Sequence, residues 1–295
     1  MIQFLISSIG SFSTMANAQS YGVDDFLAGS YLAPNGLNLP YRLFVPKNYN
    51  PSRLYPMVLF LHGAGERGTD NRLELTGQTG ELAYVNQSIE DVFMLAPQCP
   101  AASQWVNVPF SQGSYSIAST PLSNSLAATL SLQASIQRQY NIDSTRLYAT
   151  GLSMGGYGVW DLIERYPSLY AAAVPMSGGG DPANAVLLVG VPIWDFHGSV
   201  DDVVPVSGSR AQINAIRALG GTPIYTEYQG SGHNIWDAAY RTPSLISWTF
   251  SQQQVRTLIT IAPEPNQTGL LLAFCFSLTT FSIVRFQKGF SKPRS

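Results

Sequence analysis

The sequence contains little cysteine, little histidine and little charge. Its 295 residues include two cysteines and three histidines, and only 12% are Asp, Glu, Lys or Arg. Cys275 lies in an apolar C-terminal segment, which leaves Cys99 as the one cysteine of the remaining chain. An internal disulfide needs two, so a small secreted fold held together by disulfides is excluded.

The charge that is present has no strong sign. The formal net charge is −2, and no dense Lys/Arg stripe occurs in the body of the chain, so we expect no nucleic-acid partner. In contrast, 45% of the residues are hydrophobic and 12% are aromatic, which is enough for a substantial core. No internal repeat or low-complexity linker interrupts residues 19–261, and we expect these residues to form one domain.

The N-terminal residues 1–18 carry a short apolar run that ends in Ala16-Asn17-Ala18. A small residue, any residue and a small residue is the pattern that signal peptidase cleaves, so we expect a signal peptide and export. No Lys or Arg precedes the apolar run, and the alternative is a hydrophobic N-terminal strand.

The C-terminal residues 262–295 form a second unusual segment. Residues 268–284 contain no charge and are followed by four basic residues and no acidic one, as expected for a membrane helix with a cytoplasmic basic end. Together with the preceding Pro263-Glu264-Pro265, this arrangement resembles the PEP-CTERM sorting signal. The resemblance implies a Gram-negative bacterium, transient anchoring in the membrane and removal of the tail by an exosortase. An ordinary C-terminal anchor is the alternative.

Between these ends, short apolar runs alternate with stretches of helical spacing, a pattern typical of a mostly parallel sheet covered by helices. A hairpin through Pro34-Asn35-Gly36 is expected to open the sheet. The expected strands are 30–32, 41–45, 57–61, 92–96, 146–150, 171–176, 193–196 and 224–228. Three apolar helix faces are expected within 126–140, 159–166 and 213–219, all of them packed in the core.

One short motif carries a candidate nucleophile. Gly151-x-Ser153-x-Gly155 follows an expected strand and precedes an expected helix. A serine in this setting lies on a sharp turn at the carboxyl edge of the sheet, where bulky neighbours would clash. A serine hydroxyl is a weak nucleophile at neutral pH and needs a base within hydrogen-bond reach.

All three histidines, His62, His197 and His233, directly follow or closely follow an expected strand, at the edge where α/β sheets bind ligands. The chain order serine, acid, histidine of strand-turn-helix hydrolases selects His233 as the base. We expect His62 and His197 to brace their turns. A metal site is the rival interpretation, but no H-x-x-x-H or H-E-x-x-H spacing occurs, and we expect no metal.

The acid partner of the base has three candidates. Asp201 follows the next-to-last strand in H-G-x-x-D-x-x-V-P and ranks first, ahead of Asp202 and Asp181. An acid in this position holds the imidazole in the correct tautomer and stabilises its charged form.

The oxyanion that forms during acyl transfer needs hydrogen-bond donors. The backbone N–H of Met154, directly after the serine, is one candidate. The second comes from the loop after His62-Gly63, with Ala64 ahead of Gly65.

Taken together, FLHGAGERG, APQCP, GLSMGG, HGSVDDVVP and GSGH resemble the α/β-hydrolase superfamily. The similarity extends over residues 29–248 and is greatest to the branch with phospholipase/carboxylesterase-type enzymes, dienelactone hydrolases, feruloyl esterases, polyhydroxybutyrate depolymerases and predicted peptidases. It implies a single-domain α/β fold with about eight strands, the triad Ser153, Asp201 and His233, and no cofactor.

These observations favour a serine carboxylesterase that forms an acyl-enzyme on a small-molecule or polysaccharide-linked ester. The alternatives are a serine peptidase of the prolyl-oligopeptidase type and a catalytically silent surface-binding module. Two interpretations are open for Trp105, Trp236 and the loop Glu66-Arg67. All of them line the substrate pocket, or the two tryptophans pack in the core and the charges of the loop are solvated.

Overall fold

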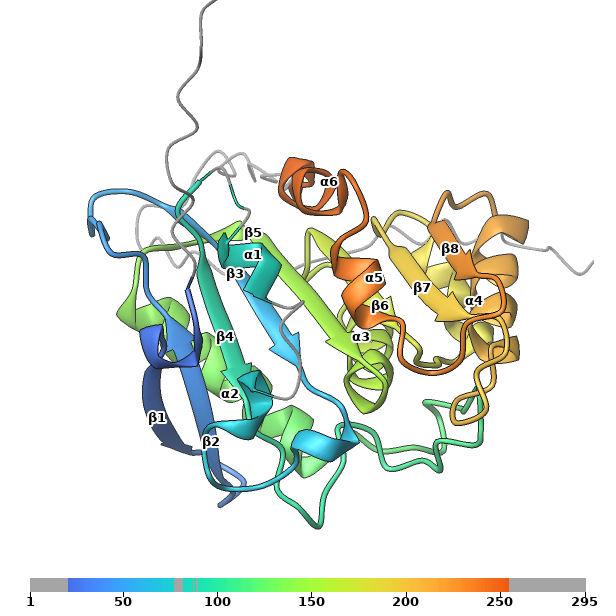
Figure 1. The fold of residues 1–295 in the computed structure, drawn as a ribbon, viewed down its shortest axis with the longest axis horizontal. Coiled ribbons are helices and arrows are strands. Elements are labelled where there is room, and N and C mark those ends of the chain that lie inside the picture. Colours follow the sequence, from blue (N-terminus) through green and yellow to red (C-terminus); the bar gives the residue numbers. More distant parts are fainter. Residues whose placement is uncertain (1–20, 77–81, 87, 89, 255–295) are drawn as a thin grey trace, which may run out of the picture. The chain divides into compact units, whose positions relative to one another are not determined.

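A computed structural model describes residues 21–76, 82–86, 88 and 90–254 of the chain. An eight-stranded sheet runs through this part (Figure 1). In sheet order its strands are β1 (Leu27–Leu32), β2 (Asn38–Phe44), β4 (Phe93–Pro97), β3 (Tyr55–Leu61), β5 (Ile142–Leu152), β6 (Ala172–Met176), β7 (Trp194–Gly198) and β8 (Ile224–Tyr228). β2 is antiparallel to both of its neighbours, and all other neighbouring pairs are parallel.

Helices cover both faces of this sheet, because its central strands bury side chains on each side. In β3, whose seven residues are all buried, Met57, Leu59 and Leu61 join one core cluster and Val58 and Phe60 the other. The first cluster includes side chains of α2 (Asn124–Gln139), α3 (Met154–Arg165) and α4 (Ser207–Ala218). The second includes side chains of α1 (Ala83–Asn86), α5 (Trp236–Tyr240) and α6 (Leu245–Ser251). Each fully buried Leu, Val or Phe contributes about 1.5–3 kcal/mol.

The short 3-10 turns complete the described elements. They are η1 (Val23–Asp25), η2 (Ala64–Glu66), η3 (Leu73–Leu75) and η5 (Pro182–Leu188). The mostly parallel sheet flanked by helices confirms the predicted fold class, and every predicted strand segment overlaps a strand of the structure.

Two glycines adopt the left-handed backbone conformation that is expected of glycine in turns and after helices. Gly36 has φ +82° in the turn that joins the antiparallel strands β1 and β2, which confirms the predicted hairpin. Gly220 has φ +89° directly after the C-cap of α4, where a left-handed residue commonly ends a helix.

The helices were predicted less completely. Three short helices, α1, α5 and α6, were not predicted, because with four, five and seven residues they are too short for a helical period to be visible. The prediction that Tyr166 and Leu219, the last residues of two expected helix faces, lie in the core is wrong. Both are C-cap residues, and they are 39% and 52% exposed because the chain leaves the helix axis there.

Three predictions concern residues outside those that the structure describes. These are the signal peptide at 1–18, the sorting tail at 262–295 and the apolar segment of that tail at 268–284. The boundaries of the domain at 19–261 also remain a prediction. Among the described residues, no helix has both the length and the apolar character that a bilayer crossing requires.

Candidate active site

The candidate nucleophile lies on a strained turn between β5 and α3. β5 ends at Leu152, and α3 begins at Met154. Ser153, between them, has φ +53° and ψ −116°, a backbone conformation that residues with a side chain rarely adopt. Its N–H donates to Met176 O of β6 at 2.8 Å, which holds the turn against the sheet. The hydroxyl is thereby presented at the carboxyl edge of the sheet.

The glycines around Ser153 are required by close backbone approaches. A Cβ atom on Gly155 would lie 1.8 Å from Leu61 O, and one on Gly156 would lie 2.4 Å from Met176 O. A Cβ atom on Gly151 would lie 2.6 Å from Gly155 O. The start of α3 therefore packs directly on the ends of the two strands that flank β5, and only glycine leaves the necessary space.

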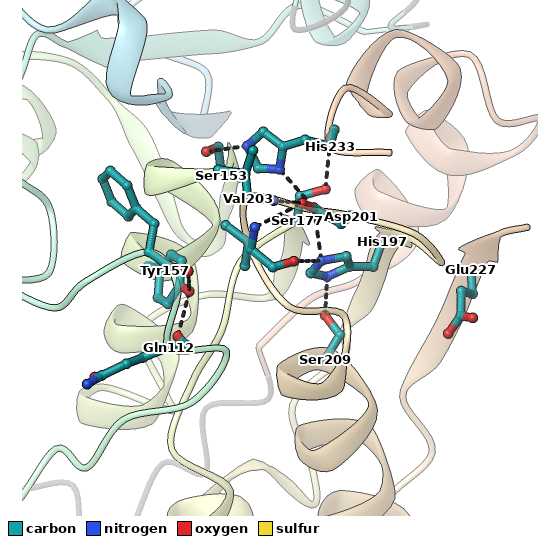
Figure 2. Close-up of polar contacts among 12 residues, drawn as sticks. Gln112, Ser153, Tyr157, Ser177, His197, Asp201, Val203, Ser209, Glu227 and His233 are labelled. Atoms are coloured by element: carbon teal, nitrogen blue, oxygen red, sulfur yellow. Dashed lines mark hydrogen bonds and ion pairs between the residues drawn. The ribbon is translucent and has the colours of Figure 1, made fainter. Parts of the chain in front are cut away.

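Two hydrogen bonds connect Ser153, His233 and Asp201, which are widely separated in the sequence (Figure 2). His233 Nε2 lies 2.8 Å from Ser153 Oγ, and His233 Nδ1 lies 2.8 Å from Asp201 Oδ2. Asp201 follows β7, and His233 lies between β8 and α5. Because a carboxylate accepts, Nδ1 carries the proton and Nε2 is free to accept the serine proton. The geometry therefore suits removal of a proton from Ser153.

Asp201 is held as a carboxylate. Its Oδ1 accepts the N–H groups of Val203 and Val204, each at 2.9 Å, and its Oδ2 faces both His233 and His197. Burial is the largest single influence and would raise the pKa of Asp201. The hydrogen bonds from the two histidines and the two backbone N–H groups together outweigh it and hold the pKa well below its usual range.

The other two acid candidates have different surroundings. Asp202 is exposed. Asp181 caps η5, where its Oδ1 accepts the N–H of Ala183, and its Oδ2 accepts the N–H of Ile117. The structure therefore brings Asp201, the first-ranked candidate, to His233.

His62 has a supporting position below the loop that follows β3. Its Nε2 accepts the N–H of Cys99 at 2.9 Å, so Nδ1 carries the proton that it donates to Gly63 O. Burial lowers the pKa of His62 to about 4, and the ring is neutral at physiological pH. This geometry agrees with a bracing role.

His197 braces its turn too, through a hydrogen bond from Nε2 to Val204 O at 3.0 Å. In addition, the same nitrogen lies 3.2 Å from Asp201 Oδ2. This second contact was not predicted from the sequence, because the four-residue spacing in the H-G-x-x-D motif does not specify the turn that brings the two side chains together.

The two candidate oxyanion donors are the first residues of two helical elements that follow adjacent strands of the sheet. Met154 is the first residue of α3, and Ala64 is the first residue of η2, which follows β3. β3 and β5 are paired in parallel, with Leu61 opposite Gly151. N–H groups in the first turn of a helix have no acceptor within the helix. Arg67 steadies the η2 turn, because its Nε donates to Ala64 O at 2.9 Å.

The structure corrects the interpretation of Trp105 as a pocket wall. Its side chain is fully buried, and its Nε1 donates to His62 O at 3.0 Å, so it packs beneath the loop after β3. Trp236 is 6% exposed, and its ring packs edge-on against the His233 imidazole with centroids 5.2 Å apart. Trp236 therefore packs against the ring of His233, in agreement with the packing alternative rather than with a pocket wall.

Metal binding has no geometric support in the described ranges. There, no group of three or more His, Cys, Asp or Glu side chains is placed to hold a metal ion.

The chain is similar in sequence and fold to known esterases. The family model described as "Putative esterase" matches residues 36–240. A crystallised thermostable esterase is 40% identical, with a TM-score of 0.71 over 78% of this chain and 64% of that one. The feruloyl esterase module from Clostridium thermocellum, complexed with sinapinate as an S954A mutant, shares the fold at 15% identity, with a TM-score of 0.54 over 81% of this chain and 95% of that one.

Curated relatives match over shorter segments. A bifunctional acetylxylan esterase/xylanase of Neocallimastix patriciarum is 35% identical over 69 residues, which are 23% of this chain and 10% of that protein. An uncharacterized secreted protein of Arthroderma benhamiae is 28% identical over 151 residues, 41% of this chain and 15% of that protein. The chain thus spans a small part of each relative's length.

The sheet order, the flanking helices and the similar structures define an α/β-hydrolase fold. Within that fold, the match over residues 36–240 shows that the chain belongs to the Esterase family.

Proposed function

We propose that this chain is a serine carboxylesterase that works through an acyl-enzyme. The observation that carries the proposal is the connected series Ser153–His233–Asp201, with both hydrogen bonds at 2.8 Å. Membership in the Esterase family supports an ester as the substrate.

The geometry suggests the following reaction. His233 Nε2 takes the proton of Ser153 while Oγ attacks the ester carbonyl carbon. The tetrahedral intermediate collapses, the C–O bond to the alcohol breaks, and His233 returns the proton to the leaving alkoxide. Water then attacks the acyl-enzyme with the same base, which releases the acid and regenerates Ser153. Asp201 stabilises the imidazolium at both stages and keeps its own proton state unchanged.

We propose the backbone N–H groups of Met154 and Ala64 as the donors to the carbonyl oxygen. The proposal is supported by their origin next to the ends of the adjacent strands β5 and β3, because Ser153 follows the end of β5. Losing one such donor in other hydrolases typically costs about 10²- to 10³-fold in rate.

For substrate and location, we propose acyl esters, among them acyl groups on extracellular polysaccharide, and an exported protein. One curated relative is named as an acetylxylan esterase and another as a secreted protein, and both names support this class. The proposal includes processing of the tail by an exosortase and transient anchoring in the membrane, which follow from the resemblance of residues 262–295 to a sorting signal.

The decisive experiment combines an active-site probe with a substrate panel. The purified full-length chain and its Ser153→Ala variant are treated with a fluorophosphonate probe, and then with p-nitrophenyl esters of graded acyl length and with peptide amides. We expect labelling and ester cleavage by the wild type and neither by the variant. Labelling that persists in Ser153→Ala would place the nucleophile elsewhere.

The remaining outcomes separate the alternatives. Cleavage of amides without esters would show a peptidase, and a wild-type chain that neither labels nor hydrolyses would show a silent binding module. Ser177→Ala is not a suitable control, because Ser177 contacts the His233 backbone. Ser251→Ala, an exposed serine in α6, is the matched variant that should keep full activity.

A further inference from the structure

One oxygen of Asp201 faces two imidazole rings. Oδ2 lies 2.8 Å from His233 Nδ1 and 3.2 Å from His197 Nε2. The Asp201 and His197 side chains are both inaccessible to solvent, so no water competes for this oxygen from their side. In the proposed reaction only His233 exchanges a proton with Ser153. The second ring has no assigned task in it.

The hydrogen-bond partners of His197 determine where its protons lie. Nε2 faces Val204 O at 3.0 Å and Asp201 Oδ2, both of which only accept, so Nε2 carries a proton in every charge state of the ring. Nδ1 lies 2.8 Å from Ser209 Oγ on α4, a hydroxyl that can donate or accept. His197 therefore donates its Nε2–H to Val204 O in every charge state, and the same nitrogen lies 3.2 Å from the carboxylate oxygen that also serves His233 (Figure 2).

Acidic groups dominate the surroundings of His197. On its own strand, the buried Asp195 carboxyl has its pKa raised to about 7 by burial, against the opposing effect of His197. Burial, the largest single influence, lowers the pKa of His197, but Asp201 and Asp195 reverse that effect and leave the pKa raised.

Three neighbouring elements contribute other titratable groups. Glu227 on β8 is the strand partner of His197, and its charge is paired with Arg210 on α4. Tyr157 on α3 is close enough for the charge of Asp201 to raise its pKa, although burial is the main cause. Tyr225 on β8 has its pKa raised chiefly by burial, with a further contribution from Asp195.

We propose that His197 is a positioning residue that shares Asp201 Oδ2 with His233 and thereby limits how strongly the carboxylate stabilises the His233 imidazolium. The proposal rests on the proposed function only for its catalytic consequence. The shared oxygen itself is a property of the structure. A base that is stabilised less in its charged form returns its proton more readily to the leaving alcohol.

The sign of the effect follows from the shared acceptor. When the His197 N–H is removed, Asp201 Oδ2 interacts with His233 only and stabilises the His233 imidazolium more strongly. The pH at which His233 gains a proton therefore rises. If His197 carries a positive charge, its removal also eliminates repulsion between two imidazolium rings, which acts in the same direction. A purely structural role predicts the opposite, because a loosened turn would move Asp201 away from His233 and lower that pH.

The test compares two amide variants of matched polarity. In His197→Gln, the side-chain amide nitrogen can replace Nε2 and keep the donor to Asp201. In His197→Asn, the shorter amide reaches the position of Nδ1 and leaves Asp201 without this donor. The full-length chain is labelled with 13C,15N-histidine and titrated by NMR. It has three histidines, so His233→Gln identifies the His233 signal.

We expect the titration midpoint of His233 in His197→Asn to lie about 0.5 to 1 pH unit above that in His197→Gln, because both variants remove the charge of His197 and only His197→Asn also removes the N–H beside Asp201. A midpoint in His197→Asn that is unchanged or lower would overturn the inference, as would equal shifts in both variants. Ser209→Ala serves if His197→Asn does not fold. This substitution removes the hydrogen bond between Ser209 Oγ and His197 Nδ1, which makes the Nε2–H of His197 a weaker donor. The His233 midpoint should then rise by a smaller amount, and an unchanged or lower midpoint would again overturn the inference.

The readout does not depend on turnover. A chain that cleaves no ester but shows the midpoint shift would support the shared carboxylate and refute the proposed function. A chain that cleaves esters without the shift would refute the shared carboxylate alone. In an active chain, the acid limb of the pH profile of kcat/KM should move with the NMR midpoint.

Discussion

The backbone strain at Ser153 leads to a prediction that separates stability from activity. Its φ of +53° with ψ of −116° costs a residue with a side chain about 1–3 kcal/mol, and glycine avoids that cost. Glycine adds about 0.5–1 kcal/mol of unfolded-state entropy relative to alanine. Ser153→Ala and Ser153→Gly lose the same hydroxyl and the same bond to His233, so these losses cancel in the comparison. We therefore expect Ser153→Gly to be more stable than Ser153→Ala by roughly 1 kcal/mol, within a range of about 0–2.5 kcal/mol.

The assay is equilibrium unfolding of both full-length variants in urea, with a melting curve as a second measurement. For a domain of this size, 1 kcal/mol corresponds to a change in Tm of roughly 2–4 °C. Both variants should be inactive toward esters. A Ser153→Gly variant that is less stable than Ser153→Ala by about 0.5–1 kcal/mol, which is the entropy cost alone, would show that the turn stores no strain, and the reasoning about this position would fail.

Three further predictions concern other parts of the chain. Asp201→Asn should reduce kcat by about 10³- to 10⁴-fold in an ester assay, whereas the exposed Asp202→Asn should leave it within about twofold, and equal losses would refute the assignment. Gly155→Ala should cost about 3 kcal/mol or more in urea unfolding because its Cβ would lie only 1.8 Å from Leu61 O, whereas Gly190→Ala, with nothing within 4 Å, should be nearly neutral. Burial raises the pKa of Glu74 to about 7, so the folded state binds the proton more tightly than the unfolded state and stability should fall as the pH rises from about 4.5 to 7. Glu74→Gln should reduce the dependence of the unfolding free energy on pH, and an unchanged dependence would refute the raised pKa of Glu74.

The strands and the serine turn could be predicted from sequence because their signals are local. Short apolar runs between turn residues indicate buried strands wherever helices cover both faces of a sheet. The glycines around Ser153 are specified by steric contacts within one strand-turn-helix unit, so they are visible in a stretch of five residues. His233 and Asp201 could be chosen by chain order and by their place after strands, before any distance was known.

The remaining features depend on contacts between distant segments. Nothing in the local sequence shows that Trp105 lies under His62, because that contact is made when the segment after β4 crosses beneath the loop after β3. The short helices α5 and α6 are stabilised by packing on the sheet rather than by their own periodicity. The contact of His197 with Asp201 arises from the tight turn after β7, whose curvature the spacing alone does not specify.

The end of β6 connects the two reactive segments of the site. Met176 O accepts the N–H of Ser153, and the hydroxyl of the next residue, Ser177, donates to His233 O at 3.2 Å. Neither contact uses a group that the proposed chemistry consumes, and one strand therefore aligns two partners that belong to other parts of the chain. Loops that meet the substrate can therefore differ in length and composition without disturbing these two hydrogen bonds, so one scaffold can accommodate substrates of different shape.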